Sequence, residues 1–320
     1  MSVREIKERL EGLFKGEIMF DEPLSAYTSL KIGGPADIMV IPRDPLSLKN
    51  VLIAADREKI PVFAIGAGTN LLVKDGGVNG IAISLKEFRD IEFIKNISKV
   101  LPEAYVTSGL NACAGLFVGA GVPLGSLINF TEKNGLSGIE ALAGIPGTFG
   151  GAICMNAGSY GTEIKDVIVS VSVMKMDGTI VELEQKEIGF SYRNSNIPED
   201  SVILSAKIVL KKDNPENVSG RVREFLRKKR LTQPSGEHSA GCVFKNPEGD
   251  SAGRLIDAAG CKGMNVGDAE VSTVHANYFV NKGKALCKDF IGLMEAVKVK
   301  VKEFSGVTLE PEIKIIGRDE

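Results

Sequence analysis

Few residues of this chain are of the kinds that bind metals or form disulfides. Its 320 residues include two histidines, His238 and His275, which are too few for a histidine-based metal cluster. The five cysteines are Cys113, Cys154, Cys242, Cys261 and Cys287. They are odd in number, lie far apart and form no C-x-x-C pair, which argues against a disulfide framework and against a zinc site. The sequence therefore predicts no metal site, and it fits a protein of the reducing cytoplasm.

The chain also lacks long apolar runs and any excess of positive charge. No run approaches the roughly 20 apolar residues of a membrane span, and no apolar stretch of signal-peptide type stands near the N-terminus. The net charge is -2 at pH 7, whereas binding to nucleic acid needs a clustered positive surface. One basic run, at residues 227–230, is more typical of a solvated helix face. We expect neither membrane insertion nor nucleic-acid binding.

The composition that remains is that of a globular protein with more than one core. Hydrophobic residues make up 43% and charged residues 25% of the chain, which are ordinary values. A chain of 320 residues favours two or three packed units. The polar, turn-rich stretch at 211–217 predicts the main domain boundary. We expect a first domain at residues 1–211, with subdomains near 1–90 and 91–211, and a smaller α+β domain at 212–320.

Hydrophobic periodicity predicts the main helices and strands. A short amphipathic helix is expected at 3–14. A β-α-β pattern follows, with strands at 37–41 and 61–65 around a helix that has Asp44 as its N-cap and Pro45 at its first position. Further strands are expected near 166–176, 179–184, 202–210, 277–281 and 312–316, and further helices near 217–230, 251–259 and 284–304.

The strand at 61–65 is followed by the glycine motif G-A-G-T-N-L-L at residues 66–72. Small residues let the backbone approach a phosphate closely, and successive N–H groups can form an anion-binding nest. Leu71 stands where the dinucleotide fingerprint G-x-G-x-x-G needs its third glycine, and no Gly-Lys-Ser/Thr follows. Alone, the motif is as compatible with a tight turn as with a phosphate site.

A second glycine cluster occupies residues 144–161, with six glycines in 18 residues. This density excludes a regular helix or strand throughout the segment. A backbone that packs against a large planar or pyrophosphate ligand needs such permissiveness, and so does a glycine-rich crossover buried in a sheet protein. The presence of two such clusters in one predicted domain favours a dinucleotide ligand.

The motif S-Y-R-N-S at residues 191–195 places Arg193 beside an aromatic residue, Tyr192. The guanidinium group offers a planar bidentate fork, which suits a carboxylate or a phosphate. Taken alone, a surface salt bridge is the more ordinary interpretation of this arginine.

Cys242 lies in the motif S-A-G-C-V-F-K-N-P at residues 239–247. Gly241 precedes it, so the backbone near the thiol is open to a ligand. A thiol with an ordinary pKa of about 8.5 can donate a proton at neutral pH. A free cysteine is more often a small buried hydrophobic residue, and the motif alone leaves both interpretations open.

Glu312 lies in the motif L-E-P-E-I-K-I-I at residues 309–316. On the strand expected there it alternates with Ile313 and Ile315, so its side chain is expected to face away from them. That direction leads either to solvent or to a site, and solvent is favoured when the motif is taken alone.

In this order, the five motifs resemble those of the UDP-N-acetylenolpyruvoylglucosamine reductases (UDP-N-acetylmuramate dehydrogenases), over nearly the whole chain. The resemblance implies an α+β fold in which an FAD-binding domain of the vanillyl-alcohol-oxidase/PCMH type, with two α/β subdomains, precedes a smaller α+β substrate-binding domain. The last strand would return to the active site. The 49 residues from Arg193 to Cys242 resemble the compact subclass, which lacks the extra substrate loop.

The resemblance also implies an activity. It is the NADPH-dependent, FAD-mediated reduction of UDP-N-acetylglucosamine enolpyruvate to UDP-N-acetylmuramate, a step of peptidoglycan precursor synthesis in the cytoplasm. The cofactors are FAD and NADPH, the partner is this small-molecule substrate, and we expect a monomer.

Residue roles carry over from the matching motifs. The catalytic residues implied are Arg193, Cys242 and Glu312. Many relatives have serine where this chain has Cys242, and a thiol is more acidic than an alcohol, so the role as proton donor is retained. The substrate-binding residues implied are Tyr192, Arg230, Asn246 and His275. The FAD-binding residues implied are Gly66, Ala67, Gly68, Thr69, Asn70, Gly144, Pro146, Gly147, Thr148, Gly150, Gly151, Asn156 and Gly158.

Two alternatives remain at the level of sequence. Another flavin oxidase or dehydrogenase of the same fold, acting on a hydroxy acid or an alcohol, would share the glycine clusters but would not need the Cys242 loop or Glu312. A nucleotide-binding module without catalysis would hold no redox-active cofactor. Fold-level analogy does not choose among these, whereas the motifs of the second half do.

Overall fold

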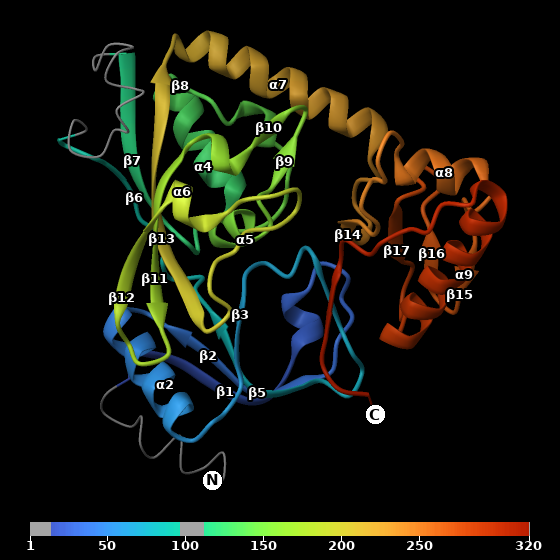
Figure 1. Ribbon diagram of the computed structural model, residues 1–320, viewed down its shortest axis with the longest axis horizontal. Helices are drawn as coiled ribbons and strands as arrows, with labels where there is room; N and C mark the ends of the chain where they lie inside the picture. The colour runs from blue at the N-terminus through green and yellow to red at the C-terminus, as the bar shows by residue number, and fades with distance from the viewer. Residues whose placement is uncertain (1–13, 97–111, 320) are drawn as a thin grey trace. The chain divides into compact units, whose positions relative to one another are not determined.

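The computed structural model describes residues 14–96 and 112–319 (Figure 1). The amphipathic helix expected at 3–14 therefore lies, except for its last residue, outside the described residues. The described residues fall into two compact units. The first unit contains residues 14–18, 39–66, 81–96 and 112–228, and the second contains residues 19–38, 67–80 and 229–319.

The first unit is built on an antiparallel sheet whose central strand is β13. The sheet order is β12-β11-β13-β7-β6, and β8 pairs with the far end of β13. The bounds are β6 Ile91–Phe93, β7 Cys113–Gly119, β8 Leu136–Ser137, β11 Ile168–Lys175, β12 Ile180–Glu184 and β13 Ser201–Lys212. Most residues of β13 are buried without polar alternation, as expected for a strand covered on both faces. Short helices α4 (Leu124–Lys133) and α5 (Phe149–Cys154) accompany this sheet.

The predicted β-α-β pattern is confirmed. Strand β2 (Pro35–Pro42), helix α2 (Pro45–Arg57) and strand β3 (Val62–Ile65) follow one another. The Asp44 carboxylate accepts a hydrogen bond of 2.7 Å from the Ser47 amide and Pro45 opens the helix, as an N-cap and first position do. With β1 (Gly16–Pro23) and β5 (Val78–Ser84), the strands form a sheet of order β1-β2-β5-β3, in which β3 and β5 are parallel.

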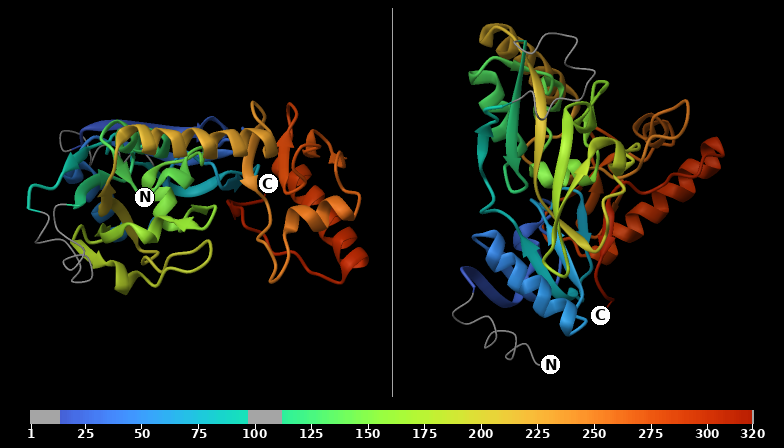
Figure 2. Two further views of the ribbon diagram at one scale, coloured as in Figure 1. Left: turned by 90° about the horizontal axis from the view of Figure 1, so that it is seen from above. Right: turned by 60° about the vertical axis from the view of Figure 1, so that its left-hand side comes forward.

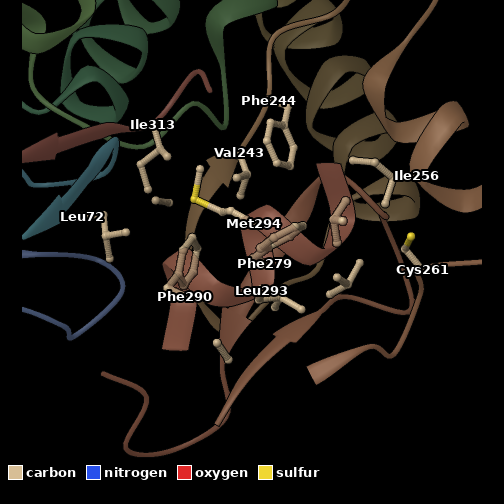
Figure 3. Packing of buried hydrophobic residues seen from close by; sticks show 14 of the residues in the cluster. Leu72, Val243, Phe244, Ile256, Cys261, Phe279, Phe290, Leu293, Met294 and Ile313 are labelled. Carbon is tan, nitrogen blue, oxygen red and sulfur yellow. The ribbon is translucent and has the colours of Figure 1, made fainter. Parts of the chain in front are cut away.

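The second unit contains a smaller antiparallel sheet and two helices. The sheet order is β14-β17-β16-β15. The bounds are β14 His238–Cys242, β15 Asn265–Val266, β16 Ala269–Val271, β17 Tyr278–Asn281, α8 Ala252–Ala258 and α9 Cys287–Ser305. Helix α9 is one unbroken helix (Figure 2). Its buried face packs on a core in which Phe279 lies 5.9 Å from Phe244 and 5.6 Å from Phe290 between ring centroids (Figure 3). Helix α7 (Pro215–Thr232) precedes β14.

The end of the chain differs from the sequence-based expectation. Strand β18 is Lys314–Ile316 and pairs in parallel with β4 (Leu71–Val73), so the expectation that Glu312 lies on this strand is wrong. The Glu312 amide instead donates to the Val243 carbonyl at 2.7 Å, which keeps this residue out of the ladder with β4. Ile313 is buried, whereas Ile315 is 38% exposed. The two isoleucines therefore do not define one buried face.

Candidate active site

Gly66, the first residue of the first glycine cluster, lies against Thr148 of the second cluster inside the first unit. A Cβ atom built on Gly66 would lie 2.6 Å from the Oγ1 atom of Thr148, closer than a real Cβ contact. Thr148 is the N-cap of α5, and its Oγ1 accepts a hydrogen bond of 3.3 Å from the Gly151 amide. The bend after β3 and the start of α5 can approach this closely because residue 66 has no side chain.

The glycines of the second cluster serve two different purposes. Gly150 is buried, and a Cβ there would lie 2.9 Å from the Cβ of Ala120, so this glycine is required for packing. Gly144, Pro146 and Gly151 are exposed. Their backbone lies at the protein surface, where a ligand can approach it closely.

The rest of the first motif belongs to the second unit. Gly68 has a φ of +59°, and a Cβ there would lie 2.1 Å from the Tyr27 carbonyl. The Gly68 carbonyl accepts a hydrogen bond of 3.1 Å from the Ser29 amide. Asn70 donates through its side-chain amide to the Glu312 carbonyl at 3.2 Å. Local packing therefore also requires small residues in this motif.

Arg193 is held in an unusual backbone conformation within the first unit. Ser191 and Asn194 exchange two backbone hydrogen bonds of 3.0 and 3.2 Å, and Arg193 between them has a φ of +55°. Its Nη1 donates to the Gly158 carbonyl at 3.1 Å, and its guanidinium carbon lies 5.4 Å from the centre of the Tyr192 ring. The turn, the second glycine cluster and the aromatic ring thus fix this half-buried cation.

Asn156 connects the Arg193 turn to the second glycine cluster. It is fully buried, and its Nδ2 donates to the Ser191 carbonyl at 3.0 Å and to the Glu163 carboxylate at 3.1 Å. Burial alone would raise the pKa of Glu163, but hydrogen bonds from Lys165 and Asn156 outweigh it and lower that pKa, with the positive charge of Arg193 acting in the same direction. An anionic Glu163 therefore accompanies the Arg193 turn at neutral pH.

In the second unit, Cys242 and Glu312 lie on adjacent segments. Cys242 ends β14 and is half-buried. The next residue, Val243, donates its N–H to the Asn277 carbonyl at 2.8 Å and accepts from the Glu312 amide at 2.7 Å. Val243 therefore ties the cysteine loop to the glutamate.

Asn277 is a site residue that the sequence motifs did not indicate. It is 1% exposed. Its Oδ1 accepts from the Phe244 amide at 2.9 Å, and its Nδ2 donates to the Phe244 carbonyl at 2.8 Å. This pair of bonds replaces a strand partner for the segment after Cys242. A lone asparagine at the first position of a predicted strand carries no sequence signal for such a role.

The four residues proposed from sequence as substrate-binding lie in different settings. His275 is half-buried, and its Nδ1 accepts from the Asn277 amide at 3.2 Å. Burial lowers the pKa of His275, which favours the neutral ring. Asn246 is exposed, and its Oδ1 accepts from the Ala252 amide at 3.0 Å at the start of α8. Arg230 on α7 and Tyr192 in the first unit are exposed.

The environments of the cysteines distinguish Cys242 from the buried thiols. Burial, together with the negative charge of Asp75, raises the pKa of Cys287 to about 12, and burial raises the pKa of Cys261. Cys113 is buried, and Cys154 is exposed. Cys242 is thus one of two cysteines that a solute can reach, and it is the one beside Glu312.

Comparison with known proteins defines the class of this molecule. The family model described as an FAD-binding domain matches residues 36–184, and the model of the UDP-N-acetylenolpyruvoylglucosamine reductase C-terminal domain matches residues 233–316. The chain is an FAD-containing oxidoreductase, and the expected fold class is confirmed. In the described part of the chain, no helix is long and apolar enough to cross a membrane.

Relatives of nearly equal length define the particular family. The chain is 37% identical to the UDP-N-acetylenolpyruvoylglucosamine reductase of Geotalea uraniireducens (strain Rf4), over 98% of both chains. It is 40% identical to the Rickettsia akari (strain Hartford) reductase, over 95% of this chain and 97% of that one. The crystal structure of the Thermus caldophilus reductase matches with a TM-score of 0.77 and 35% identity, covering 94% of this chain and 99% of that chain. The chain belongs to the UDP-N-acetylenolpyruvoylglucosamine reductase family, as the five motifs indicated.

Proposed function

We propose that this chain reduces UDP-N-acetylglucosamine enolpyruvate to UDP-N-acetylmuramate with FAD and NADPH, in peptidoglycan precursor synthesis. The observation that carries the proposal is the connection of Cys242 and Glu312 through Val243. Another flavin oxidase or dehydrogenase of the same fold would not need an acidic group at both Cys242 and Glu312. The family match over nearly the whole chain supports the same choice.

The residues present fit an FAD. The close approach of Gly66 to Thr148 leaves no room for a Cβ, and the exposed backbone at Gly144 and Gly151 is accessible to a ligand. We propose that the bound group is held by Gly66, Ala67, Gly68, Thr69, Asn70, Gly144, Pro146, Gly147, Thr148, Gly150, Gly151, Asn156 and Gly158. When bound, FAD supplies hydride transfer from NADPH to the terminal vinyl carbon of the substrate.

Side chains of the protein then stabilise the negative charge that hydride addition to the vinyl carbon leaves on the substrate. Negative charge develops on the adjacent carbon and on its carboxylate, as an enolate. The Arg193 guanidinium stabilises it, with Glu312 in its protonated or hydrogen-bonded form, because fixed donors aimed at developing charge lower the barrier. The bond from Arg193 to the Gly158 carbonyl supports this role by holding the guanidinium in one place.

Cys242 completes the reduction. Its thiol gives a proton to the carbon that carries the negative charge, so that one hydride and one proton have been added across the double bond. The thiolate regains a proton from solvent. General acid catalysis of this kind contributes roughly 10²–10⁴-fold in typical enzymes. The half-exposed position of Cys242 beside Glu312 supports this assignment.

The remaining assignments follow from the same family. We propose that Tyr192, Arg230, Asn246 and His275 bind the substrate, and that residues 1–211 and 212–320 are the FAD-binding and substrate-binding domains. The family-model matches at 36–184 and 233–316 support this division. The enzyme is proposed to act in the cytoplasm as a monomer, with no nucleic-acid partner.

An anaerobic absorption spectrum tests the proposal. Flavin bands of the purified protein should bleach with NADPH and return when UDP-N-acetylglucosamine enolpyruvate is added. Bands that bleach with NADPH but do not return when this substrate is added would point to another flavin oxidoreductase of the same fold. A protein that cannot be loaded with FAD would exclude a flavoenzyme.

A further inference from the structure

Asn70 makes two hydrogen bonds to the segment that contains Glu312. Its side-chain Nδ2 donates to the Glu312 carbonyl at 3.2 Å, and its backbone carbonyl accepts from the Lys314 amide at 3.0 Å. All three residues belong to the second unit. The first bond is to the peptide before Ile313 and the second is to the peptide after it. Asn70 therefore contacts the backbone directly after the glutamate.

Backbone hydrogen bonds hold the segment on both sides of Glu312, and one of them runs from the Lys245 amide to the Glu310 carbonyl at 2.9 Å. The parallel ladder between β18 and β4 begins only at Lys314, which pairs with Leu71. On the other side, the Val243 carbonyl accepts from the Glu312 amide at 2.7 Å and from the Ile313 amide at 3.3 Å. Ile313, Leu72 and Val243 are anchored in the buried core (Figure 3), whereas Glu312 is only half-buried. The bonds to Val243 hold this segment through its amides, and the Asn70 side chain donates to the Glu312 carbonyl.

We propose that Asn70 is a positioning residue for Glu312. The Asn70 amide fixes the direction of the Glu312 peptide, and through it the direction in which the carboxyl group leaves the backbone. This inference rests on the proposed function, in which Glu312 acts on the reacting substrate. Asn70 lies in the G-A-G-T-N-L-L loop, which explains why this loop needs an amide at that point in addition to small residues. A role confined to holding FAD would not require a donor on the Glu312 carbonyl.

A double-mutant cycle separates the two roles of Asn70. In Asn70→Ala loaded with FAD, substrate-driven reoxidation of the flavin should slow about tenfold, the effect of one lost positioning hydrogen bond. Because Asn70 is also proposed to hold FAD, both half-reactions are measured at saturating FAD, and reoxidation by the substrate should slow at least several-fold more than flavin reduction by NADPH. In a Glu312→Gln background, Asn70→Ala should cause no further slowing, because residues that act as a unit are not additive. Equal slowing of reoxidation in both backgrounds, or equal slowing of the two half-reactions in Asn70→Ala, would overturn the proposal.

Hydrogen exchange gives a readout that needs no turnover. Amides of residues 309–316 should exchange at least several-fold faster in FAD-loaded Asn70→Ala than in the wild type. Asn265→Ala is the matched control, since Asn265 also donates from its side chain to a backbone carbonyl, that of Gly267 at 3.4 Å, at an exposed position of the same unit. It should leave exchange and both half-reactions unchanged. If wild-type flavin is not reoxidised by the substrate, the proposed function fails, whereas unchanged exchange in Asn70→Ala refutes the positioning role by itself.

Discussion

Buried or half-buried asparagines hold the backbone at three points of the candidate site. Asn70 contacts the Glu312 segment, Asn156 contacts the Arg193 turn, and Asn277 contacts the segment after Cys242. An amide side chain can donate and accept hydrogen bonds at once. It can therefore satisfy backbone N–H and C=O groups that have no partner in a strand or helix. Arg193 and Glu312 stand on irregular backbone and Cys242 ends β14, and these three asparagines hydrogen-bond to the backbone beside them.

The role of Cys242 leads to a prediction at the scale of one residue. Cys242→Ala should keep flavin reduction by NADPH at the wild-type rate but slow reoxidation by the substrate by roughly 10²–10⁴-fold, because the proton donor is gone. Cys242→Ser should retain measurable turnover, since a hydroxyl can also donate. Stopped-flow absorbance of the two half-reactions measures both rates.

Cys154→Ala is the control for this experiment, because Cys154 is the other cysteine that is accessible in the described residues. It should behave like the wild type in both half-reactions. Full-rate reoxidation in Cys242→Ala would show that the proton comes from another group.

At the scale of elements, helix α7 carries a lysine in an unfavourable setting. Lys229 is 6% exposed, and burial lowers its pKa from the ordinary value of 10.5 to about 8. Because the folded state binds this proton less tightly than the unfolded chain, the charged form costs stability below pH 8. That cost is lost as the pH rises from about 8 toward the unfolded value.

Lys229→Met should therefore stabilise the protein at pH 7. The variant keeps the apolar stem and removes the buried charge, and we expect a gain of about 1–3 kcal/mol in the free energy of unfolding. The gain should shrink as the pH rises above about 8, when the wild-type lysine becomes neutral in the folded state. Denaturant melts at several pH values measure it. Lys300→Met, at an exposed position of α9, should show no such pH dependence, and a loss of stability in Lys229→Met at pH 7 would contradict burial as the dominant effect.

At the scale of the whole molecule, FAD should act as a folding ligand. A ligand that binds only the folded state stabilises it by mass action, by about 2.7 kcal/mol at one hundred times its dissociation constant. Removal of FAD should accordingly lower the melting temperature. In Gly66→Ala most of this difference should disappear, because the added Cβ would lie 2.6 Å from Thr148 Oγ1 at the proposed cradle.

Gly125→Ala is the matched control for that variant. It lies on α4 of the same unit, and a Cβ there meets nothing within 4 Å. Calorimetry with and without FAD should give the wild-type difference for Gly125→Ala. An undiminished FAD effect in Gly66→Ala would argue against a contact between this bend and the cofactor.

The sequence by itself determined the regular elements and the family. Asp44 and Pro45 mark the start of α2, and the strands near 62, 168 and 201 lie where periodicity placed them, because these signals act between residues close in the chain. The five motifs identified the family, and relatives of nearly equal length confirm it. The roles of individual site residues remain predictions.

Only the tertiary structure decided how the irregular segments are held. Glu312 lies before β18 because its amide bonds to Val243, and Gly66 must be small because Thr148 lies against it. Asn70 reaches a residue 242 positions away. Such partners are brought together by packing of segments remote in sequence, and periodicity within a short window carries no information about them.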